Sequence, residues 1–558
     1  MGPENDSDAL LAQLRDDLGY RRIEQGLQSL ERIKPTVEAL DPKSPHSGVL
    51  VGLVAQWVDA GFDGPDILRL LLTKFPPSVR ATLPLSDYLH LRMAEGKVAM
   101  SQEDLDRAAG HFRFVQSLEQ EVDDRELFAI ANFWTGRCLR ITGQYDDALN
   151  YIVRGEELAL ECGYTQMAAI MQATRSWLAF QKGKLHEAIT ILGRAEEALS
   201  RTNDFLSRGN VQSAYGRIAR RQGRYERALE YLEAAIAEYR QGGRAQLQLA
   251  RALLNLAFVN RRLALKSQKE FDRASASRRS AKQETEQHTE LTRNARLEIE
   301  RIRGQARAQL DEAMEIYARH NNHRGIAGVH INRGFLFLDS GDLDCAAAES
   351  AEAFRHGEEK RDYITMARAR MLQCVIENAA LEEQFGDPAR HQEAAEISAR
   401  DAVGFASQTQ DQRLLARTLV WQGLTAAAEP SGDLEAARRC YDQAVALLQP
   451  QASERQHVWD DLERLQAIVL RARPIDPLLR SWSAGLVGDK TFQQITEEFA
   501  GVIIPKVWER EGRKVSRVAE RLSISPKKVR RILHAAGLLA KEPRPRNGPY
   551  PASGSGAP

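Results

Sequence analysis

The densest set of side chains that could bind a charged ligand lies near the C-terminus. Five basic residues fall within one short stretch: Lys527, Lys528, Arg530, Arg531 and His534. Guanidinium and ammonium groups bind phosphate oxygens and the acceptor edge of guanine. The surrounding stretch 506–546 has 13 Lys and Arg residues and four acids, a local net charge of +9 (13 − 4), whereas the whole chain has 77 residues of each sign. A basic end on an acidic body indicates a polyanionic partner; the alternative is a solvated basic surface.

The sequence predicts a short capped helix over about 526–536 that carries these side chains. Ser525 is a favourable N-cap and Pro526 suits the first helical position. Gly537 suits the residue that follows a helix, and Leu538 is placed to pack back on it. The apolar residues of the helix share one face: Val529, Ile532, Leu533 and Ala536. The basic residues should therefore point outward.

Two preceding segments should support this helix. Residues 514–522 predict a helix that buries Val518, Ala519 and Leu522, and Ile524 should fill the turn. Residues 491–511 predict a longer helix, which Pro505 kinks or splits in two. Its apolar residues are Phe492, Ile495, Phe499, Val502, Ile503 and Val507. Two helices that cross at a small residue and share a short turn form a helix-turn-helix arrangement.

The stretch 503–538 resembles the Fis-type helix-turn-helix found at the C-terminus of bacterial enhancer-binding activators. The resemblance rests on Ser516-Arg517-Val518-Ala519, Ile524-Ser525, Val529-Arg530 and Gly537-Leu538, and the chain departs from it at Ser523, Pro505 and Pro526. It implies that the second helix enters the major groove of double-stranded DNA, and that a homodimer is possible. The expected DNA-binding residues are Arg513, Lys514, Ser516, Arg517, Ser525, Lys527, Lys528, Arg530, Arg531 and His534. The alternative is a helical cap that docks to protein.

A second pattern recurs over most of the chain. A glycine, any residue, a Tyr or Leu, two residues and an alanine occur at Gly143, Gly183, Gly223, Gly341 and Gly432. A small residue lies seven positions before four of these glycines: Gly136, Ser176, Gly216 and Gly334. Another follows each alanine by seven positions: Gly155, Ala195, Ala235, Ala353 and Ala444. Glycine ends one helix, the small residues let two antiparallel helices approach, and neighbouring pairs must stack to bury their apolar faces.

This pattern resembles the tetratricopeptide repeat family over roughly residues 45–450. The resemblance implies an all-α, right-handed helical solenoid whose concave groove displays the first helix of each pair and binds a peptide or protein. Its groove positions correspond to Arg137, Arg140, Asn210, Arg217, Arg220, Arg251 and Arg261. Several arginines in one groove suit an acidic or C-terminal peptide through bidentate contacts; the alternative is solvent-facing arginines without a ligand.

One repeat is interrupted by a charged stretch over about 262–308. It predicts either an overlong helical hairpin or a partly disordered insertion, and a projecting partner-binding arm is the functional alternative. The expected domains are an N-terminal helical cap (1–44), the repeat array (45–473), the Fis-like domain (477–540) and a disordered tail (541–558). Pro474 and Pro477 should end the array.

The remaining residues indicate a binding protein and no enzyme. No phosphate loop, GxSxG or HExxH occurs. His320 and His323 are expected to be turn histidines, the five cysteines form no CxxC pair, and neither a metal nor a cofactor is expected. No signal peptide or membrane span is predicted, so a cytoplasmic protein is expected. The resemblance to bacterial activators implies a bacterial protein that lies on the nucleoid when it is bound to DNA. These features predict a DNA-binding transcriptional regulator with a ligand-binding repeat array; the alternative is a scaffold or adaptor protein.

Overall fold

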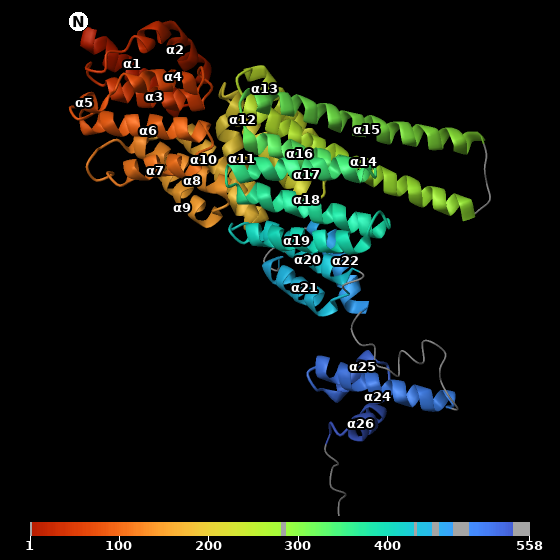
Figure 1. Ribbon diagram of the computed structural model, residues 1–558. Helices are drawn as coiled ribbons and strands as arrows, with labels where there is room; N and C mark the ends of the chain where they lie inside the picture. Colours follow the sequence, from red (N-terminus) through yellow and green to blue (C-terminus); the bar gives the residue numbers. More distant parts are fainter. Residues whose placement is uncertain (1–2, 281–285, 429–431, 449–456, 472–489, 540–558) are drawn as a thin grey trace, which may run out of the picture. The chain divides into compact units, whose positions relative to one another are not determined.

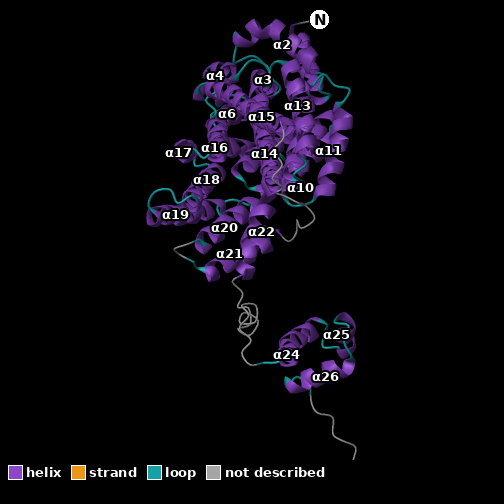
Figure 2. Ribbon diagram, turned by 90° about the vertical axis from the view of Figure 1, so that its right-hand side faces the viewer, coloured by secondary structure: helices purple, strands orange, loops and turns teal. Residues whose placement is uncertain are grey.

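Small residues at fixed spacing bring the helices of this chain together in pairs. The computed structural model describes residues 3–280, 286–428, 432–448, 457–471 and 490–539. Within those ranges the ordered elements are all α-helices and no residue lies in a strand (Figure 2). The chain divides into two compact units, Met1–Ala467 and Ile468–Pro558. The predicted tail and the prolines expected to end the array lie outside the described residues.

The first unit is an array of antiparallel helix pairs (Figure 1). Its N-terminal half contains α1 (Pro3–Gly19), α2 (Ile23–Glu38), α3 (Ser47–Asp59), α4 (Pro65–Thr73), α5 (Pro77–Arg80), α6 (Leu85–Ser101), α7 (Leu105–Gln116), α8 (Arg125–Thr142), α9 (Tyr145–Glu161), α10 (Thr165–Gln181) and α11 (Leu185–Leu199). The array continues with α12 (Phe205–Arg221), α13 (Tyr225–Gly242), α14 (Gln246–Ser280), α15 (Glu286–Arg319), α16 (His323–Asp339), α17 (Leu343–Glu359), α18 (Tyr363–Glu382), α19 (Pro388–Ala406), α20 (Gln412–Ala427), α21 (Leu434–Leu448) and α22 (His457–Arg471). The predicted all-α solenoid is confirmed.

The repeat pattern has the physical role expected of it. Gly143 and Gly223 have φ values of 86° and 72°, the left-handed conformation that side chains disfavour. The alanine that follows each turn is fully buried: Ala148, Ala188, Ala228, Ala346 and Ala437. A Cβ atom at Gly136 would lie 2.7 Å from the side chain of Ile152, so a larger residue would force α8 and α9 apart. The Tyr or Leu two positions after the glycine is less uniformly buried, since Leu434 in the last pair is 40% exposed.

The charged insertion is part of a helical hairpin. The two helices α14 and α15 are 35 and 34 residues long, about twice the length of their neighbours, and they extend past the adjacent pairs (Figure 1). This is the first of the two structures considered for that stretch. Residues 281–285, between the two helices, lie outside the described residues.

Segments distant in the sequence also meet within the first unit. Arg21 Nε donates to Asp204 Oδ2 over 2.6 Å, across 183 residues of chain. The backbone N–H of His323 donates to a carboxylate oxygen of Glu103 over 2.9 Å, across 220 residues. Tyr145 Oη and Asp411 Oδ2 are 3.1 Å apart, across 266 residues. The array therefore turns back on itself and encloses part of its inner surface.

Beyond the end of α22, the described residues of the second unit form three helices: α24 (Phe492–Arg510), α25 (Val515–Arg521) and α26 (Pro526–Ala535). Their shared core contains Ile504, Trp508, Val518, Ala519, Val529, Ile532 and Leu533. A capping box at Thr491 begins α24, which continues through Pro505 as one helix. Ser525 caps α26, since its side chain accepts from the Lys528 backbone N–H.

Two expectations for this bundle are wrong, those for Ala536 and Leu538. Ala536 was expected to face inward but is exposed, because α26 ends one residue earlier. Leu538 is 40% exposed, and Leu539 packs against the core in its place. Phe492 and Phe499 are 85% and 46% exposed, because the first half of α24 extends past the two short helices that cover its second half.

Candidate functional site: an arginine-lined pocket and a basic three-helix bundle

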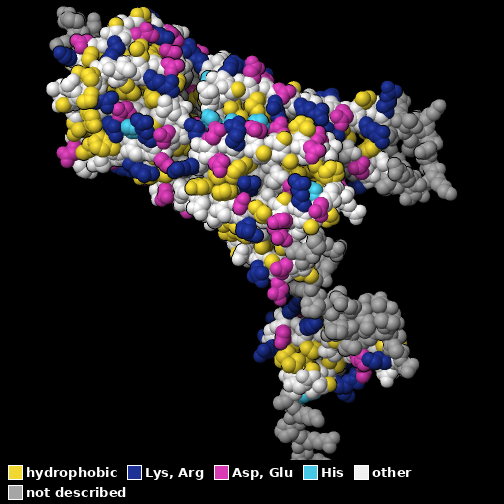
Figure 3. Space-filling model, viewed as in Figure 1, with side chains coloured by type: hydrophobic (Ala, Val, Ile, Leu, Met, Phe, Trp, Pro, Cys, Tyr) yellow, Lys and Arg dark blue, Asp and Glu magenta, His cyan; other side chains and the backbone are white. Residues whose placement is uncertain are grey.

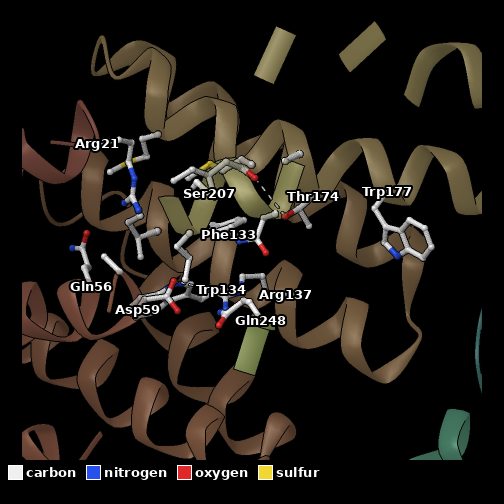
Figure 4. Close-up of a pocket in the computed structure, with 18 of the residues that line it drawn as sticks. Arg21, Gln56, Asp59, Phe133, Trp134, Arg137, Thr174, Trp177, Ser207 and Gln248 are labelled. Carbon is white, nitrogen blue, oxygen red and sulfur yellow. Dashed lines mark hydrogen bonds and ion pairs between the residues drawn. The ribbon is translucent and has the colours of Figure 1, made fainter. Parts of the chain in front are cut away.

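A pocket opens on the inner side of the array (Figure 4). Its lining comes mainly from the first helix of successive pairs, α3, α8, α10, α12 and α14. Its volume is about 140 Å³, and one water molecule needs about 15 Å³ by the same measure. The pocket can therefore take a ligand group of several non-hydrogen atoms.

Five of the seven residues expected in the groove line this pocket together: Arg137, Arg140, Asn210, Arg217 and Arg251. They come from α8, α12 and α14, which are far apart in the sequence. The other two lie elsewhere. Arg220 stacks on the ring of Phe258 at 4.6 Å. Arg261 is almost fully buried, and its Nε and Nη2 atoms contact Asp339 at 2.5 and 2.7 Å, so it stabilises the array internally.

One carboxylate belongs to the pocket. Asp59, at the end of α3, lies beside Arg137 and Trp134 (Figure 4). It accepts from Arg137 over 2.5 Å and from the indole N–H of Trp134 over 3.2 Å, and it also pairs with Lys97. Burial alone would raise the pKa of Asp59, but the charges of Arg137 and Lys97 hold it below its ordinary value. One acid thus balances two cations at this end of the pocket.

The other arginines of the pocket have less compensation. Arg140, Arg217 and Arg251 form no ion pair with a carboxylate among the described residues, and Arg251 donates to the amide oxygen of Asn210 over 2.9 Å. Burial, followed by the charges of Arg251 and Arg137, lowers the pKa of Arg140 to about 9. Burial, followed by the charges of Arg251 and Arg140, lowers the pKa of Arg217 well below its ordinary value. Several guanidinium groups repel one another there, and a bound anion would relieve that repulsion.

Aromatic side chains complete the wall. Trp177 contacts two cations: the guanidinium of Arg217 lies 4.3 Å and that of Arg221 4.6 Å from its ring centroid. Asp59, Trp134 and Trp177 were not predicted as site residues. Asp59 lies two residues before Gly61, a glycine with positive φ in a turn, but nothing in the sequence pairs it with Arg137, 78 residues away.

The basic residues predicted to bind DNA lie on the second unit, whose described surface carries Lys and Arg side chains (Figure 3). Most are exposed: Arg513, Lys514, Ser516, Arg517, Ser525, Lys527, Arg530 and Arg531. Lys528 and His534 are half-buried, and His534 Nδ1 lies 2.9 Å from the carbonyl oxygen of Leu539, so these two are less available than expected. Arg531 pairs with Glu497 over 2.7 Å.

Among the residues predicted to bind DNA, five exposed cations have no carboxylate partner in the described part of the chain: Arg513, Lys514, Arg517, Lys527 and Arg530. They belong to α25, α26 and the turn before α25. Ser523, in the turn between α25 and α26, has φ 51°, so it adopts the left-handed conformation. Because both helices are short and share a core, these cations are held on a small rigid surface.

Comparison with known proteins agrees with the architecture of the first unit. The tetratricopeptide repeat family model matches residues 93–157 and 214–257, so the chain contains tetratricopeptide repeats. No curated protein matches the chain.

Among solved structures, a Rap protein complexed with Competence and Sporulation Factor is similar. It has 13% identity and a TM-score of 0.50, over 73% of this chain and 99% of that one. The apo quorum sensor NprR from B. thuringiensis has 12% identity and a TM-score of 0.46, over 71% and 99% of the two chains. An IFIT1 monomeric mutant with Gppp-AAAA has 13% identity and a TM-score of 0.45, over 80% and 86%. At this identity the Rap likeness shows a shared helical fold.

No helix in the described part of the chain is long and apolar enough to cross a membrane.

Proposed function

We propose that this protein is a DNA-binding transcriptional regulator whose repeat array binds an acidic peptide or protein segment. The observation that carries the DNA-binding part is a set of five exposed cations without a carboxylate partner among the described residues, located on α25, on α26 and in the turn before α25; the two helices share one core. Such a pair of helices has the form of a helix-turn-helix, in which the second helix, here α26, enters the major groove.

Each basic group has a role in this proposal. Lys527 and Arg530 on α26 would contact base edges or nearby phosphates. Arg531 would make the same kind of contact once its ion pair with Glu497 is broken. Arg513, Lys514 and Arg517 would contact the DNA backbone, which positions the bundle and supplies salt-dependent affinity.

The pocket supports the second part of the proposal. Arg140, Arg217 and Arg251 provide guanidinium donors that lack a carboxylate partner among the described residues, and Trp177 provides an apolar wall. Arginine binds carboxylates through two parallel N–H···O bonds, so an Asp or Glu side chain or a C-terminal carboxylate suits this pocket. The solved Rap structure of similar fold also contains a second molecule, Competence and Sporulation Factor.

A scaffold or adaptor protein is the alternative, and one observation favours it. Phe492 and Phe499 are exposed on α24, and apolar side chains of this size often contact another protein. In that case the second unit docks to protein and its cations only solvate the surface.

Fluorescence anisotropy with the full-length protein tests the proposal. Labelled duplexes of genomic sequence are titrated at low salt with the wild type, with Arg517→Ala/Arg530→Ala, and with Arg521→Ala as the matched control, since Arg521 pairs with Glu511. We expect binding that the double variant weakens at least about tenfold and the control weakens much less. Absence of binding at low salt, or equal binding by all three proteins, contradicts DNA binding.

A second titration tests the pocket. Labelled Asp- and Glu-rich peptides with a free C-terminus are compared with their Asn and Gln counterparts that end in an amide. Binding of the acidic peptides alone supports the proposal, and equal affinity for both sets contradicts it.

A further inference from the structure

Histidine and glutamate side chains gather between α16 and α17, outside the arginine-lined pocket. His323 and His330 lie seven residues apart, about two turns, on one face of α16. On α17 the spacing of Glu349, Glu352, His356 and Glu359 produces one stripe along the helix. The two helices form one antiparallel pair, so these faces meet.

Three ligand atoms converge at one end of this cluster. His323 Nδ1 is 3.3 Å from His356 Nδ1 and 3.0 Å from Glu359 Oε2, and His356 Nδ1 is 4.0 Å from Glu359 Oε2. In a tetrahedral site with metal–ligand bonds of about 2.0–2.1 Å, ligand atoms are about 3.3–3.4 Å apart. The three distances lie around that value, so little movement would bring all three atoms onto one ion.

The environment suits a cation. His356 is half-buried, and the carboxylates of Glu359 and Glu352 lie near its ring nitrogens. The groups that face His356 are His323, Glu359, His330, Glu352 and Arg355. The ring of His330 stacks on it at 5.8 Å, and Arg355 Nη2 lies 3.1 Å from its Nε2.

Metal binding through Nδ1 would leave the proton of His356 on Nε2, where Arg355 now lies. Arg355 is half exposed and also pairs with Glu352 and Glu359, so it can turn away. Glu352 has a carboxylate oxygen within 4.8 Å of a ring nitrogen of His356 and of His330. It is the acceptor available to that proton, as carboxylates often are behind metal-binding histidines.

We propose that His323, His356 and Glu359 bind one divalent transition-metal ion, with Zn²⁺ as the best match. Two imidazole nitrogens and one carboxylate oxygen are a common ligand set for zinc, and the fourth position stays open to water or another ligand. The site would join the start of α16 to the end of α17.

The site also lies where distant parts of the array meet. The backbone N–H groups of His323 and Arg324 donate to the carboxylate of Glu103 over 2.9 and 3.4 Å. Lys360, next to Glu359, donates to the carbonyl oxygen of Gln102 over 3.2 Å. A metal ion bound to His323 and Glu359 would therefore stabilise this contact between segments about 220 residues apart.

Zinc titration of the untagged full-length protein tests the proposal. After treatment with a chelator, the protein competes for Zn²⁺ with a chromophoric chelator, and Co²⁺ is added separately to record its visible absorption. We expect one zinc ion per chain and the intense Co²⁺ absorption of tetrahedral coordination. Absence of zinc binding overturns the proposal.

Four variants locate the ion. His323→Ala and Glu359→Gln should each weaken zinc binding at least about tenfold, since even the loss of a residue behind a ligand costs about that much. His320→Ala and His330→Ala are controls and should retain the wild-type affinity. Glu359 is 40% exposed, so its substitution leaves folding intact, which the melting temperatures of the metal-free proteins would verify. The assignment is overturned if His323→Ala and Glu359→Gln both bind zinc with wild-type affinity. It is also overturned if His330→Ala loses zinc binding while His323→Ala retains it.

Discussion

The two basic regions of this protein present the same kind of charge in opposite surroundings. In the array, Arg140, Arg217 and Arg251 lie partly buried on the inner side, and burial lowers the pKa of the first two. In the terminal bundle, Arg517 and Arg530 are exposed to water. A buried cation is costly and binds an anion strongly and with little screening, whereas an exposed one costs little and acts through salt-sensitive attraction.

The largest expected difference between the two regions is the stability lost when an acidic partner of their cations is neutralised. Asp59→Asn would leave Lys97 and Arg137 without their carboxylate, so we expect a loss of about 3 kcal/mol in the free energy of unfolding. In the bundle, Glu497→Gln breaks the exposed pair with Arg531 and should cost less than about 1 kcal/mol. Urea denaturation of both variants measures this. Equal losses of unfolding free energy in the two variants would contradict the difference between buried and exposed ion pairs.

The effect of Asp59 should also depend on pH. Its pKa is lower in the folded than in the unfolded protein, so its contribution is complete above the ordinary aspartate pKa of about 4. The contribution is lost as the pH falls through the folded value, and Asp59→Asn should therefore approach wild-type stability in acid.

The second prediction concerns the ligand of the pocket. Arg140→Gln/Arg217→Gln removes two charged donors, each worth about 1.5–3 kcal/mol to a bound carboxylate, so affinity for the acidic peptide should fall at least about 100-fold. Isothermal titration calorimetry measures it. Arg261→Gln is not an adequate control because it breaks the pair with Asp339; Arg227→Gln on α13, whose side chain is exposed, is the matched control.

The third prediction concerns salt. Removal of Arg517 and Arg530 should reduce the slope of log affinity for DNA against log salt by about 2, one for each phosphate that these arginines no longer neutralise. The acidic peptide should show a shallower dependence, because the pocket is partly shielded from ions. Anisotropy at several salt concentrations records both slopes, and identical slopes would show that the pocket is as open as the bundle.

The smallest expected effect is the change in unfolding free energy when a single arginine of either region is neutralised. Arg140→Gln removes a cation whose pKa burial lowers to about 9, so the free energy of unfolding at neutral pH should rise by about 1 kcal/mol. Arg530→Gln should change it by less than about 0.5 kcal/mol. Because Arg140 has its lowered pKa only in the folded state, the stability gained by the variant should disappear as the pH rises above about 9. Thermal unfolding of Arg140→Gln and the wild type at neutral pH and above pH 9 tests whether the variant is the more stable protein only at the lower pH.

Local spacing predicted most of the fold and only part of the site. The small residues of the repeat determine where helices pair. Ala148 and Ala228 could be recognised as buried contact residues because each follows a glycine and a tyrosine within six consecutive residues. The groove arginines followed from the same repeat. The partners Asp59 and His356 could not be predicted, because they lie 78 and 33 residues from the side chains they meet.

In the bundle, the apolar spacing identified the core residues Val518, Val529 and Leu533. It could not show that Phe492 and Phe499 are exposed, since a helix pattern does not reveal how far the neighbouring helices extend. The availability of Lys528 and His534 was overestimated for the same reason.

A crossed binding experiment tests most directly whether the two regions are separate anion-binding sites. Labelled DNA and labelled acidic peptide are each titrated with the wild type, with Arg140→Gln/Arg217→Gln and with Arg517→Ala/Arg530→Ala. We predict that the first variant loses the peptide and keeps DNA, and that the second loses DNA and keeps the peptide. If either double variant loses both ligands while its melting temperature is unchanged, the two regions are not separate anion-binding sites.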